Sequence, residues 1–343
     1  MAASKRMGYA VIGLGGFAQR TILPGFKHSK KGKLVALVSG DRLKAKRLAG
    51  KFGAAAFYTY DELPSCLSDP QVEAVYVATN NGSHARYAVQ AANAGKHVLC
   101  EKPMANSVEE CRQMLAAARA SDVRLMIAYR KYFEPSSLEL KKLYTSRKLG
   151  RLKYIHSAFG IFLPPVLERG AWHLDPQLSG GGSLPDLGVY CVSTIRWLLG
   201  EEPHEVSAYQ WAADPVRFSL VDESIAFRLD FPSGTVAQCT SSFQAAESSF
   251  LQVNGEKGWA CLSPAFQYDL TRCLFGEIGG RWFEKKFHVI DELALEIDAL
   301  ADAVRRRREP GPNGVEGMRD MAVIEAIYQS AREGRTVPIT MPE

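Results

Sequence analysis

Short apolar runs alternate with helical patterns over the first 130 residues of the chain. The apolar runs are strand-like and occur at residues 9–13, 34–39, 56–58, 74–78, 97–100 and 125–128. Between them, apolar residues recur at helical spacing at residues 17–28, 42–52, 63–67, 83–94 and 108–121. A strand that is followed by a helix needs a crossover connection to reach the next strand. The pattern therefore predicts an α/β domain with a doubly wound parallel sheet.

The pattern changes after residue 130. A helical stretch at residues 136–146 precedes alternating, strand-like stretches at residues 206–211, 224–231 and 235–243. Strands that are joined by short turns favour an antiparallel sheet. The chain becomes helical again at residues 289–308 and 315–333. We therefore predict two domains, residues 1–130 and residues 131–343, of which the second is an α+β domain with an open, largely antiparallel sheet.

A glycine-rich loop follows the first predicted strand. Residues 11–18 read Val-Ile-Gly-Leu-Gly-Gly-Phe-Ala, which fits the pattern G-x-G-x-x-A with Gly13, Gly15 and Ala18. In this pattern the first glycine permits a tight turn, the second lets the backbone approach a pyrophosphate, and the small third residue allows close helix–strand packing. Because the loop lies between a strand and a helix, it predicts a Rossmann domain that binds a dinucleotide.

The end of the second predicted strand bears on the choice of dinucleotide. NAD-binding domains usually carry an acidic residue there for the ribose 2′-hydroxyl, whereas this chain has Ser39. Arg42 and Lys44 follow and can bind a 2′-phosphate. Asp41 argues for NAD unless it caps the next helix. The sequence therefore predicts NADP in preference to NAD.

Two segments carry candidate catalytic residues. Glu101 and Lys102 end a buried strand, either as charges at the strand exit or as groups at the carboxyl edge, where doubly wound sheets bind ligands. In the glycine-rich segment 179–190, Asp186 and Tyr190 are four residues apart and share one helical face. Taken singly, Asp186 is also an ordinary N-cap and Tyr190 an ordinary half-buried core tyrosine.

The chain resembles the Gfo/Idh/MocA oxidoreductase family in segments that extend from the first strand to the last helix. The matching segments are GLGGFA, ATNNGSH, AGKHVLCEKPMA, AYR, GGGSLPDLGVY, RWLLGEEP and VEGMRDMAVIEAIYQSAREGR. The motifs E-K-P and D-x-G-x-Y are the most specific of these. The resemblance is closest to the glucose–fructose oxidoreductase and aldose–aldose oxidoreductase branch, and it implies that the second domain binds substrate and forms oligomers.

This resemblance implies hydride transfer between NADP and a sugar carbon, with Lys102 and Tyr190 as the catalytic pair. Tyr190 would exchange a proton with the sugar oxygen. A free phenol ionises near pH ~10, so a neighbouring Lys102 ammonium would be needed to favour the phenolate. Asp186 and Arg130 would bind the sugar, together with Lys102 and Tyr190.

The implied activity is oxidation of a pyranose at C1 to the lactone by an NADP-dependent aldose oxidoreductase. A second sugar would accept the hydride if NADP stays bound, and free NADP would accept it in a plain dehydrogenase. The alternatives are an NADP-dependent xylose or dihydrodiol dehydrogenase and a non-enzymatic NADP-sensing regulator of the same fold.

The motifs also imply a set of cofactor contacts. They are Gly13, Gly15, Gly16, Phe17, Ala18, Ser39, Gly40, Arg42, Lys44, Thr79, Asn80, Asn81, His84, Glu101, Lys102, Arg130 and Trp172. Alternatively, His84 is only a polar residue at a helix N-terminus and does not contact the cofactor. His173 replaces the arginine that follows the tryptophan in relatives. The sequence therefore leaves open how tightly this segment binds NADP.

Composition narrows the remaining classes of function. Seven cysteines without a C-x-x-C pair argue against a zinc site and a disulfide framework, and we expect no metal. The net charge of +5 comes from scattered basic clusters, so nucleic acid is not an expected partner. No apolar segment is long enough to span a membrane, and a cytoplasmic location is expected.

The second domain is expected to associate through its sheet. The resemblance implies a homodimer or homotetramer that uses this surface. Trp211, Phe227 and Phe243 are the aromatic residues expected on it, unless they lie in the core beneath the helices.

Overall fold

The computed structural model describes residues 6–164 and 171–342. The chain divides into two compact units. The first unit extends to Arg130 and includes Asp291–Met318, and the second comprises Lys131–Ile290 and the residues from Arg319 onwards.

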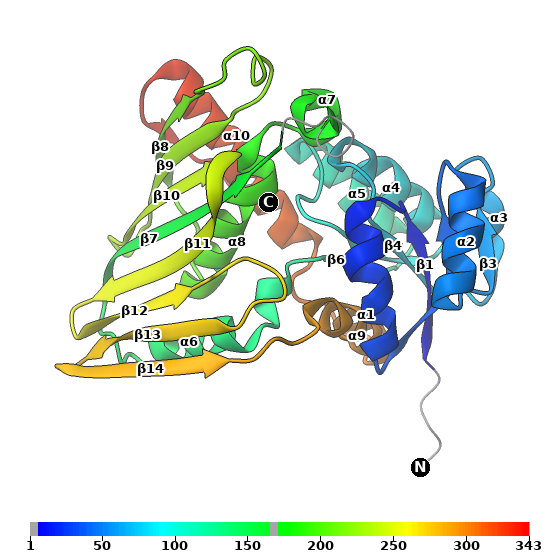
Figure 1. The fold of residues 1–343 in the computed structure, drawn as a ribbon, viewed down its shortest axis with the longest axis horizontal. Coiled ribbons are helices and arrows are strands. Elements are labelled where there is room, and N and C mark those ends of the chain that lie inside the picture. The colour runs from blue at the N-terminus through cyan, green and yellow to red at the C-terminus, as the bar shows by residue number, and fades with distance from the viewer. Residues whose placement is uncertain (1–5, 165–170, 343) are drawn as a thin grey trace. The chain divides into compact units, whose positions relative to one another are not determined.

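The first unit contains a six-stranded sheet in which every neighbouring pair is parallel (Figure 1). The strand order is β3-β2-β1-β4-β5-β6. The strands are β1 Met7–Ile12, β2 Gly32–Val38, β3 Ala56–Tyr58, β4 Ala74–Val77, β5 His97–Cys100 and β6 Leu125–Ile127. The predicted doubly wound parallel sheet is therefore confirmed.

Helical segments connect these strands. They are the π-helix η1 Ala18–Ile22, α1 Leu23–His28, α2 Arg42–Phe52, α3 Leu63–Ser68, the 3-10 turn η2 Asn81–Ser83, α4 His84–Asn93 and α5 Val108–Ala120. Helix α2 begins where the Asp41 carboxylate accepts the Lys44 N–H at 2.9 Å, and it ends at Gly53 in the left-handed conformation. Asp41 is thus the N-cap of this helix, which removes the main sequence signal against NADP.

Helix α9, Glu292–Arg305, belongs to the first unit although it lies far along the chain. The Tyr9 hydroxyl donates to the Ile297 carbonyl at 2.8 Å, and the Ser29 hydroxyl donates to the Asp298 carboxylate at 2.6 Å. The predicted boundary had grouped this segment with residues 131–343. The buried face of α9 instead packs against α1 and the first sheet.

The second unit contains a nine-stranded mixed sheet with the order β14-β13-β12-β11-β7-β10-β9-β8-β15 (Figure 1). Its strands are β7 Leu152–Phe162, β8 Glu205–Trp211, β9 Ser224–Asp230, β10 Val236–Ser242, β11 Gln244–Gly255, β12 Gly258–Ser263, β13 Arg272–Ile278, β14 Arg281–Phe287 and β15 Val337–Pro338. The β10–β7 pair is parallel, and the other pairs are antiparallel. The predicted largely antiparallel sheet is confirmed.

The remaining helical segments complete the chain. They are η3 Arg130–Tyr132, α6 Pro135–Thr145, η4 Ala171–Leu174, α7 Pro176–Ser179, the π-helix η5 Leu184–Gly188, α8 Val189–Leu199 and α10 Gly314–Glu333. Helix α8 is almost entirely buried, and it follows η5 without a break. This continuous helical segment positions Asp186 and Tyr190.

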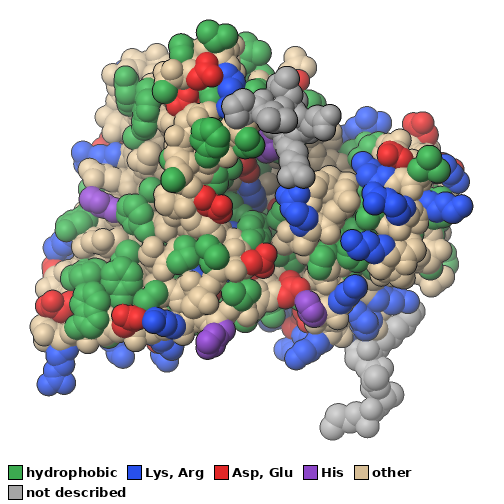
Figure 2. Space-filling model, viewed as in Figure 1, with side chains coloured by type: hydrophobic (Ala, Val, Ile, Leu, Met, Phe, Trp, Pro, Cys, Tyr) green, Lys and Arg blue, Asp and Glu red, His purple; other side chains and the backbone are tan. Residues whose placement is uncertain are grey.

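Phe227 and Phe243 lie in the core, the alternative to the surface role expected for them, because they are 4% and 0% exposed. Phe227 alternates with exposed residues along β9 and points to the buried face of the sheet. Trp211 is exposed, as predicted, and it stacks on Tyr209. Further hydrophobic side chains gather over strands β12–β14 at one end of the sheet (Figure 2). Trp282 on the edge strand β14 is exposed.

Two features are absent from residues 6–164 and 171–342. In that part of the chain, no helix is both long and apolar enough to cross a membrane. No three His, Cys, Asp or Glu side chains in the same residues are grouped to hold a metal ion.

Candidate active site

The glycine loop of the first unit has the backbone that a dinucleotide needs. Gly13 has a φ of 99°, and a Cβ there would lie 2.5 Å from the Ala78 carbonyl oxygen. A Cβ on Gly15 would meet no atom within 4 Å, so the backbone at Gly15 is open to an incoming group. Gly16 is exposed, Phe17 is half-buried and Ala18 is buried where η1 begins. The loop therefore fits a pyrophosphate at the start of a helical segment.

The end of β2 offers one buried hydroxyl and one exposed cation. Ser39 is buried, and its hydroxyl oxygen accepts the Asp41 N–H at 3.2 Å. The Arg42 guanidinium binds Glu62, and this contact lowers the pKa of that carboxyl to about 2. The contact with Glu62 uses Nη1 of Arg42, and the guanidinium carries further N–H donors that suit a ribose phosphate. Gly40 and Lys44 flank these residues at the surface.

His84 links the ends of β4 and β5. Its Nδ1 lies 2.9 Å from the Pro103 carbonyl oxygen, and its Nε2 lies 3.3 Å from the Thr79 carbonyl oxygen. Burial lowers the pKa of His84 to about 4, so the ring is neutral near pH 7. Asn80 accepts the Ser83 hydroxyl at 2.8 Å, and the neighbouring Asn81 is buried. His84 therefore supports the turn that carries Lys102.

Lys102 lies at the carboxyl end of β5, the strand between β4 and the edge strand β6. It is half-buried and precedes a cis peptide bond to Pro103. Its backbone N–H donates to the Glu101 carboxylate at 3.3 Å, and Tyr76 donates to the same carboxylate at 2.8 Å. Burial raises the pKa of Glu101, while these two hydrogen bonds and the positive charge of Lys102 act to lower it. Glu101 thus fixes the backbone from which Lys102 projects.

A buried charged cluster lies in the same unit. Arg130 is 2% exposed and forms an ion pair with Glu292 of α9. Glu296, one turn further along α9, is 0% exposed, and neither of its carboxylate oxygens has a hydrogen-bond partner among the described residues. Burial, Glu101 and Glu292 raise the pKa of Glu296 well above its usual value, and Arg130 opposes them. Burial of Glu296 therefore favours its protonated form in the folded protein.

Replacing Glu296 by glutamine is expected to stabilise the protein at pH 8 but not near pH 4. The folded state holds a proton on Glu296 that the unfolded state releases above pH ~4.5, so the wild type loses stability as the pH rises toward the folded pKa. The advantage of Glu296→Gln should grow by up to about 1.4 kcal/mol per pH unit. Urea unfolding of both proteins between pH 4 and 8 measures this difference in the free energy of unfolding.

The exposed Glu277 on β13 supplies the matched control. Glu277→Gln should leave the pH dependence of the free energy of unfolding unchanged. A Glu296→Gln variant whose free energy of unfolding differs from wild type by the same amount at every pH would contradict a buried, protonated Glu296.

In the second unit, Asp222 anchors the glycine-rich segment. Its carboxylate accepts the N–H groups of Gly182 at 2.7 Å and Leu184 at 2.9 Å, and the Ser183 hydroxyl at 2.8 Å. A Cβ on Gly182 would lie 1.8 Å from the Asp222 carbonyl oxygen, so only glycine allows this approach. No motif in the sequence marks Asp222, because it lies about 40 residues from the turn it holds. The anchored turn leads directly into η5.

Asp186 lies in η5, next to the residue that departs from the family pattern. Its side chain is 24% exposed, and its carboxylate lies 3.8 Å from His173 Nε2. The Trp172 ring packs on the His173 ring with centroids 3.8 Å apart. His173 is therefore placed to interact with the carboxylate that is predicted to bind sugar hydroxyls.

Tyr190 lies at the start of α8 in a largely aromatic environment. It is 6% exposed, and Phe159 and Phe266 pack against its ring at 5.5 and 5.6 Å between centroids. Its hydroxyl lies 3.0 Å from the hydroxyl of Tyr268. Sequence reasoning missed Tyr268, because no motif or spacing distinguishes residues 264–271. The structure thus adds a second phenol to the predicted site.

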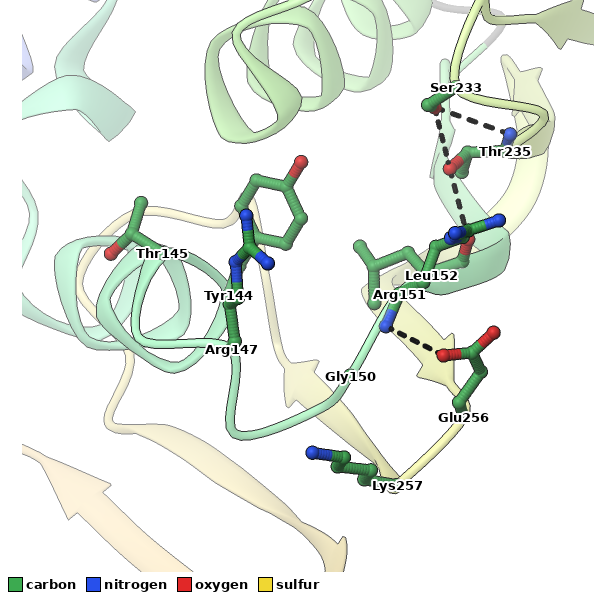
Figure 3. Close-up of a pocket in the computed structure, with 10 residues that line it drawn as sticks. All are labelled: Tyr144, Thr145, Arg147, Gly150, Arg151, Leu152, Ser233, Thr235, Glu256 and Lys257. Carbon is green, nitrogen blue, oxygen red and sulfur yellow. Dashed lines mark hydrogen bonds between the residues drawn. The ribbon is translucent and has the colours of Figure 1, made fainter.

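A separate hollow of about 580 Å³ in the second unit shares no residue with the predicted site (Figure 3). Arg147, Arg151 and Lys257 line it, together with Tyr144 and Thr235. These cations are exposed, and the Arg151 N–H donates to the Glu256 carboxylate at the same edge. We assign no chemistry to this hollow.

The structure places the predicted residues in two groups. The glycine loop, Ser39, His84, Glu101, Lys102 and Arg130 lie in the first unit, and Trp172, Asp186 and Tyr190 lie in the second. The roles predicted for these residues stay predictions. The approach of the Lys102 ammonium to the Tyr190 phenol stays a prediction.

Comparison with known proteins gives matches over both units. Residues 7–129 match the model of an oxidoreductase family with an NAD-binding Rossmann fold, and residues 137–261 match the GFO/IDH/MocA C-terminal domain. The D-xylose 1-dehydrogenase (NADP(+)) of Haloarcula marismortui is 31% identical over 334 residues, which cover 96% of this chain and 92% of that protein.

Two further relatives extend this result. A trans-1,2-dihydrobenzene-1,2-diol dehydrogenase of Danio rerio is 34% identical over 69% of this chain and 66% of its own. The crystal structure of an aldose–aldose oxidoreductase from Caulobacter crescentus, complexed with glycerol, superposes with a TM-score of 0.93 at 36% identity and covers 97% of this chain and 100% of that chain. The chain belongs to the Gfo/Idh/MocA oxidoreductase family.

Proposed function

We propose that the protein is an NADP-dependent aldose oxidoreductase that oxidises a pyranose at C1 to the lactone. The observation that carries this proposal is the anchored helical segment of the second unit. It holds the Asp186 carboxylate and the Tyr190 phenol four residues apart, beside an aromatic wall formed by Phe159 and Phe266. A carboxylate for hydroxyl groups and a phenol for proton exchange are the groups that sugar oxidation needs.

The residues of the chain divide the work between them. Tyr190 removes the proton from the sugar oxygen, and Lys102 stabilises the phenolate form of Tyr190. Asp186 accepts hydrogen bonds from sugar hydroxyls and orients the ring, while Arg130 and Glu101 keep the end of the first sheet in place. NADP, when bound, supplies the hydride acceptor at nicotinamide C4.

The choice of NADP rests on three observations. Ser39 carries no charge at the ribose position, and Asp41 is engaged as a helix cap. The xylose dehydrogenase relative is named for NADP. NAD is the less favoured cofactor.

A xylose or dihydrodiol dehydrogenase is the second candidate, because relatives at 31% and 34% identity carry those names. These activities use the same two catalytic residues and differ in the substrate and in the release of the cofactor. A non-enzymatic NADP-sensing regulator is the third candidate, and it would have no need of Tyr190. We further propose a cytoplasmic protein that forms a homodimer or homotetramer through the sheet face bearing Trp211 and Tyr209.

The absorbance of the purified protein at the reduced-nicotinamide band tests the proposal. An aldose together with NADP should generate the band, and NAD should give a lower kcat/KM. Conversion of a sugar mixture without added nucleotide supports a retained cofactor, whereas strict dependence on added NADP supports a plain dehydrogenase. Absence of reduction with glucose, xylose and other aldoses would contradict aldose oxidation, and a diol substrate would then select the second candidate.

A further inference from the structure

Tyr268 lies in the turn that connects β12 and β13. Its hydroxyl oxygen is 3.0 Å from the Tyr190 hydroxyl oxygen, which is a normal hydrogen-bond distance for two hydroxyls. Tyr190 is 6% exposed, whereas Tyr268 is half-buried. The two phenols therefore form a pair in which one member is enclosed by protein and the other reaches toward the surface.

The turn that carries Tyr268 is held by buried hydrogen bonds. The Ser249 hydroxyl oxygen accepts the N–H groups of Ala265 at 2.9 Å and Phe266 at 2.8 Å, and Ser249 also bonds to the Gln267 side chain. Arg272, which is 1% exposed, donates to the Gln267 carbonyl at 2.7 Å. These bonds are made within the second unit, so Tyr268 is positioned before any substrate arrives.

The chemistry of the pair determines which phenol donates. When both phenols are neutral, either one can donate to the other. Once Tyr190 loses its proton, its oxygen can only accept, and Tyr268 must be the donor. A hydrogen bond to a charged oxygen is stronger than one between neutral groups, so this bond favours the ionised form of Tyr190. The aromatic rings of Phe159 and Phe266 limit the number of competing donors around Tyr190.

We propose that Tyr268 is a positioning residue that donates its hydroxyl hydrogen to the Tyr190 phenolate and stabilises it. The inference rests on the proposed role of Tyr190 as the base. In the reaction, the sugar O–H bond breaks and the Tyr190 O–H bond forms. The C–H bond of the carbon that bears this oxygen would break as its hydride passes to bound NADP, and the C–O bond would become a double bond. Tyr190 then releases its proton to water. The Tyr268 O–H bond stays intact throughout, so Tyr268 acts only through Tyr190.

The pH dependence of kcat tests this inference. Tyr268→Phe should move the rising limb of the profile to higher pH by about one to two units, because it removes one hydrogen bond to a charged group. On that limb the rate should fall about 10- to 100-fold at fixed pH, and it should return toward the wild-type rate at high pH. Tyr144→Phe is the matched control, since its hydroxyl bonds only weakly to the Leu199 carbonyl and lies outside the site.

A second variant guards against a folding defect in Tyr268→Phe. Ser249→Ala removes the acceptor that orders the turn, and it should displace the limb in the same direction by a smaller amount. An unshifted limb in a folded Tyr268→Phe, or an equal loss of rate at every pH, overturns the inference.

The proposed function can fail separately. If no aldose reduces NADP, the proposed function fails; if Tyr190→Phe retains wild-type turnover, Tyr190 is not the base and the proposed roles of both tyrosines fail. If Tyr190→Phe is inactive and Tyr268→Phe keeps the wild-type profile, only the role of Tyr268 is lost.

Discussion

Tyr190→Phe and Lys102→Met are each expected to lower kcat by about 10²- to 10⁴-fold while leaving the fold intact. The phenylalanine ring can occupy the space between Phe159 and Phe266, so only the hydroxyl is lost. Methionine retains the length of the lysine stem but removes the charge that favours the phenolate. Steady-state rates with the best aldose and NADP measure the effect.

The double variant Tyr190→Phe/Lys102→Met shows whether the two residues act together or independently. If Lys102 acts by stabilising the Tyr190 phenolate, the double variant should be little slower than Tyr190→Phe alone, because the two residues act as one unit. Lys153→Met is the control, since Lys153 is an exposed cation paired with Glu256 in the second unit. Additive losses in the double variant would contradict the pairing, and normal turnover in Tyr190→Phe would contradict the role of Tyr190 as the base.

Asp320→Ala is expected to destabilise the protein by about 3–5 kcal/mol. Arg196 on α8 is 1% exposed at its side chain and forms ion pairs with Asp320, which is 0% exposed, and with Glu202. Removing Asp320 leaves a buried guanidinium with one of its two carboxylates missing. Urea unfolding at pH 7 measures the loss, and the transition should move to a clearly lower midpoint.

An exposed ion pair provides the comparison for this prediction. The Arg335 side chain is 62% exposed and pairs with Glu333, so Arg335→Ala should cost no more than about 1 kcal/mol. If Asp320→Ala and Arg335→Ala lowered the free energy of unfolding equally, burial of Arg196 would not explain the cost of losing Asp320.

The first unit could be predicted because its signals are local. The predicted ranges 42–52, 56–58 and 97–100 match the observed α2, β3 and β5 residue for residue. Each is a short apolar run or a helical pattern that is bounded by a cap, a turn or a charge. The glycine loop and the turn at Lys102 depend on neighbouring residues in the sequence, so their positions could be predicted as well.

Features that depend on distant contacts could not be predicted in this way. Strands β7 and β11–β14 carry no motif, and their order is set by pairing across the sheet rather than by local pattern. Asp222 and Tyr268 reach the site only after residues far apart in sequence are brought together. Phe243 looked exposed because the sequence does not say which face of a strand the helices cover.

The return of helix α9 to the first unit has a consequence for synthesis of the chain. A ribosome completes the six parallel strands early, but it must translate the whole of Lys131–Ile290 before α9 emerges. At about 5–20 residues per second, that interval lasts on the order of ten seconds or longer. During it, the nascent nucleotide-binding half exposes the apolar surface that Leu293, Ile297 and Leu300 later cover. Its maturation is therefore tied to the last part of translation rather than the first.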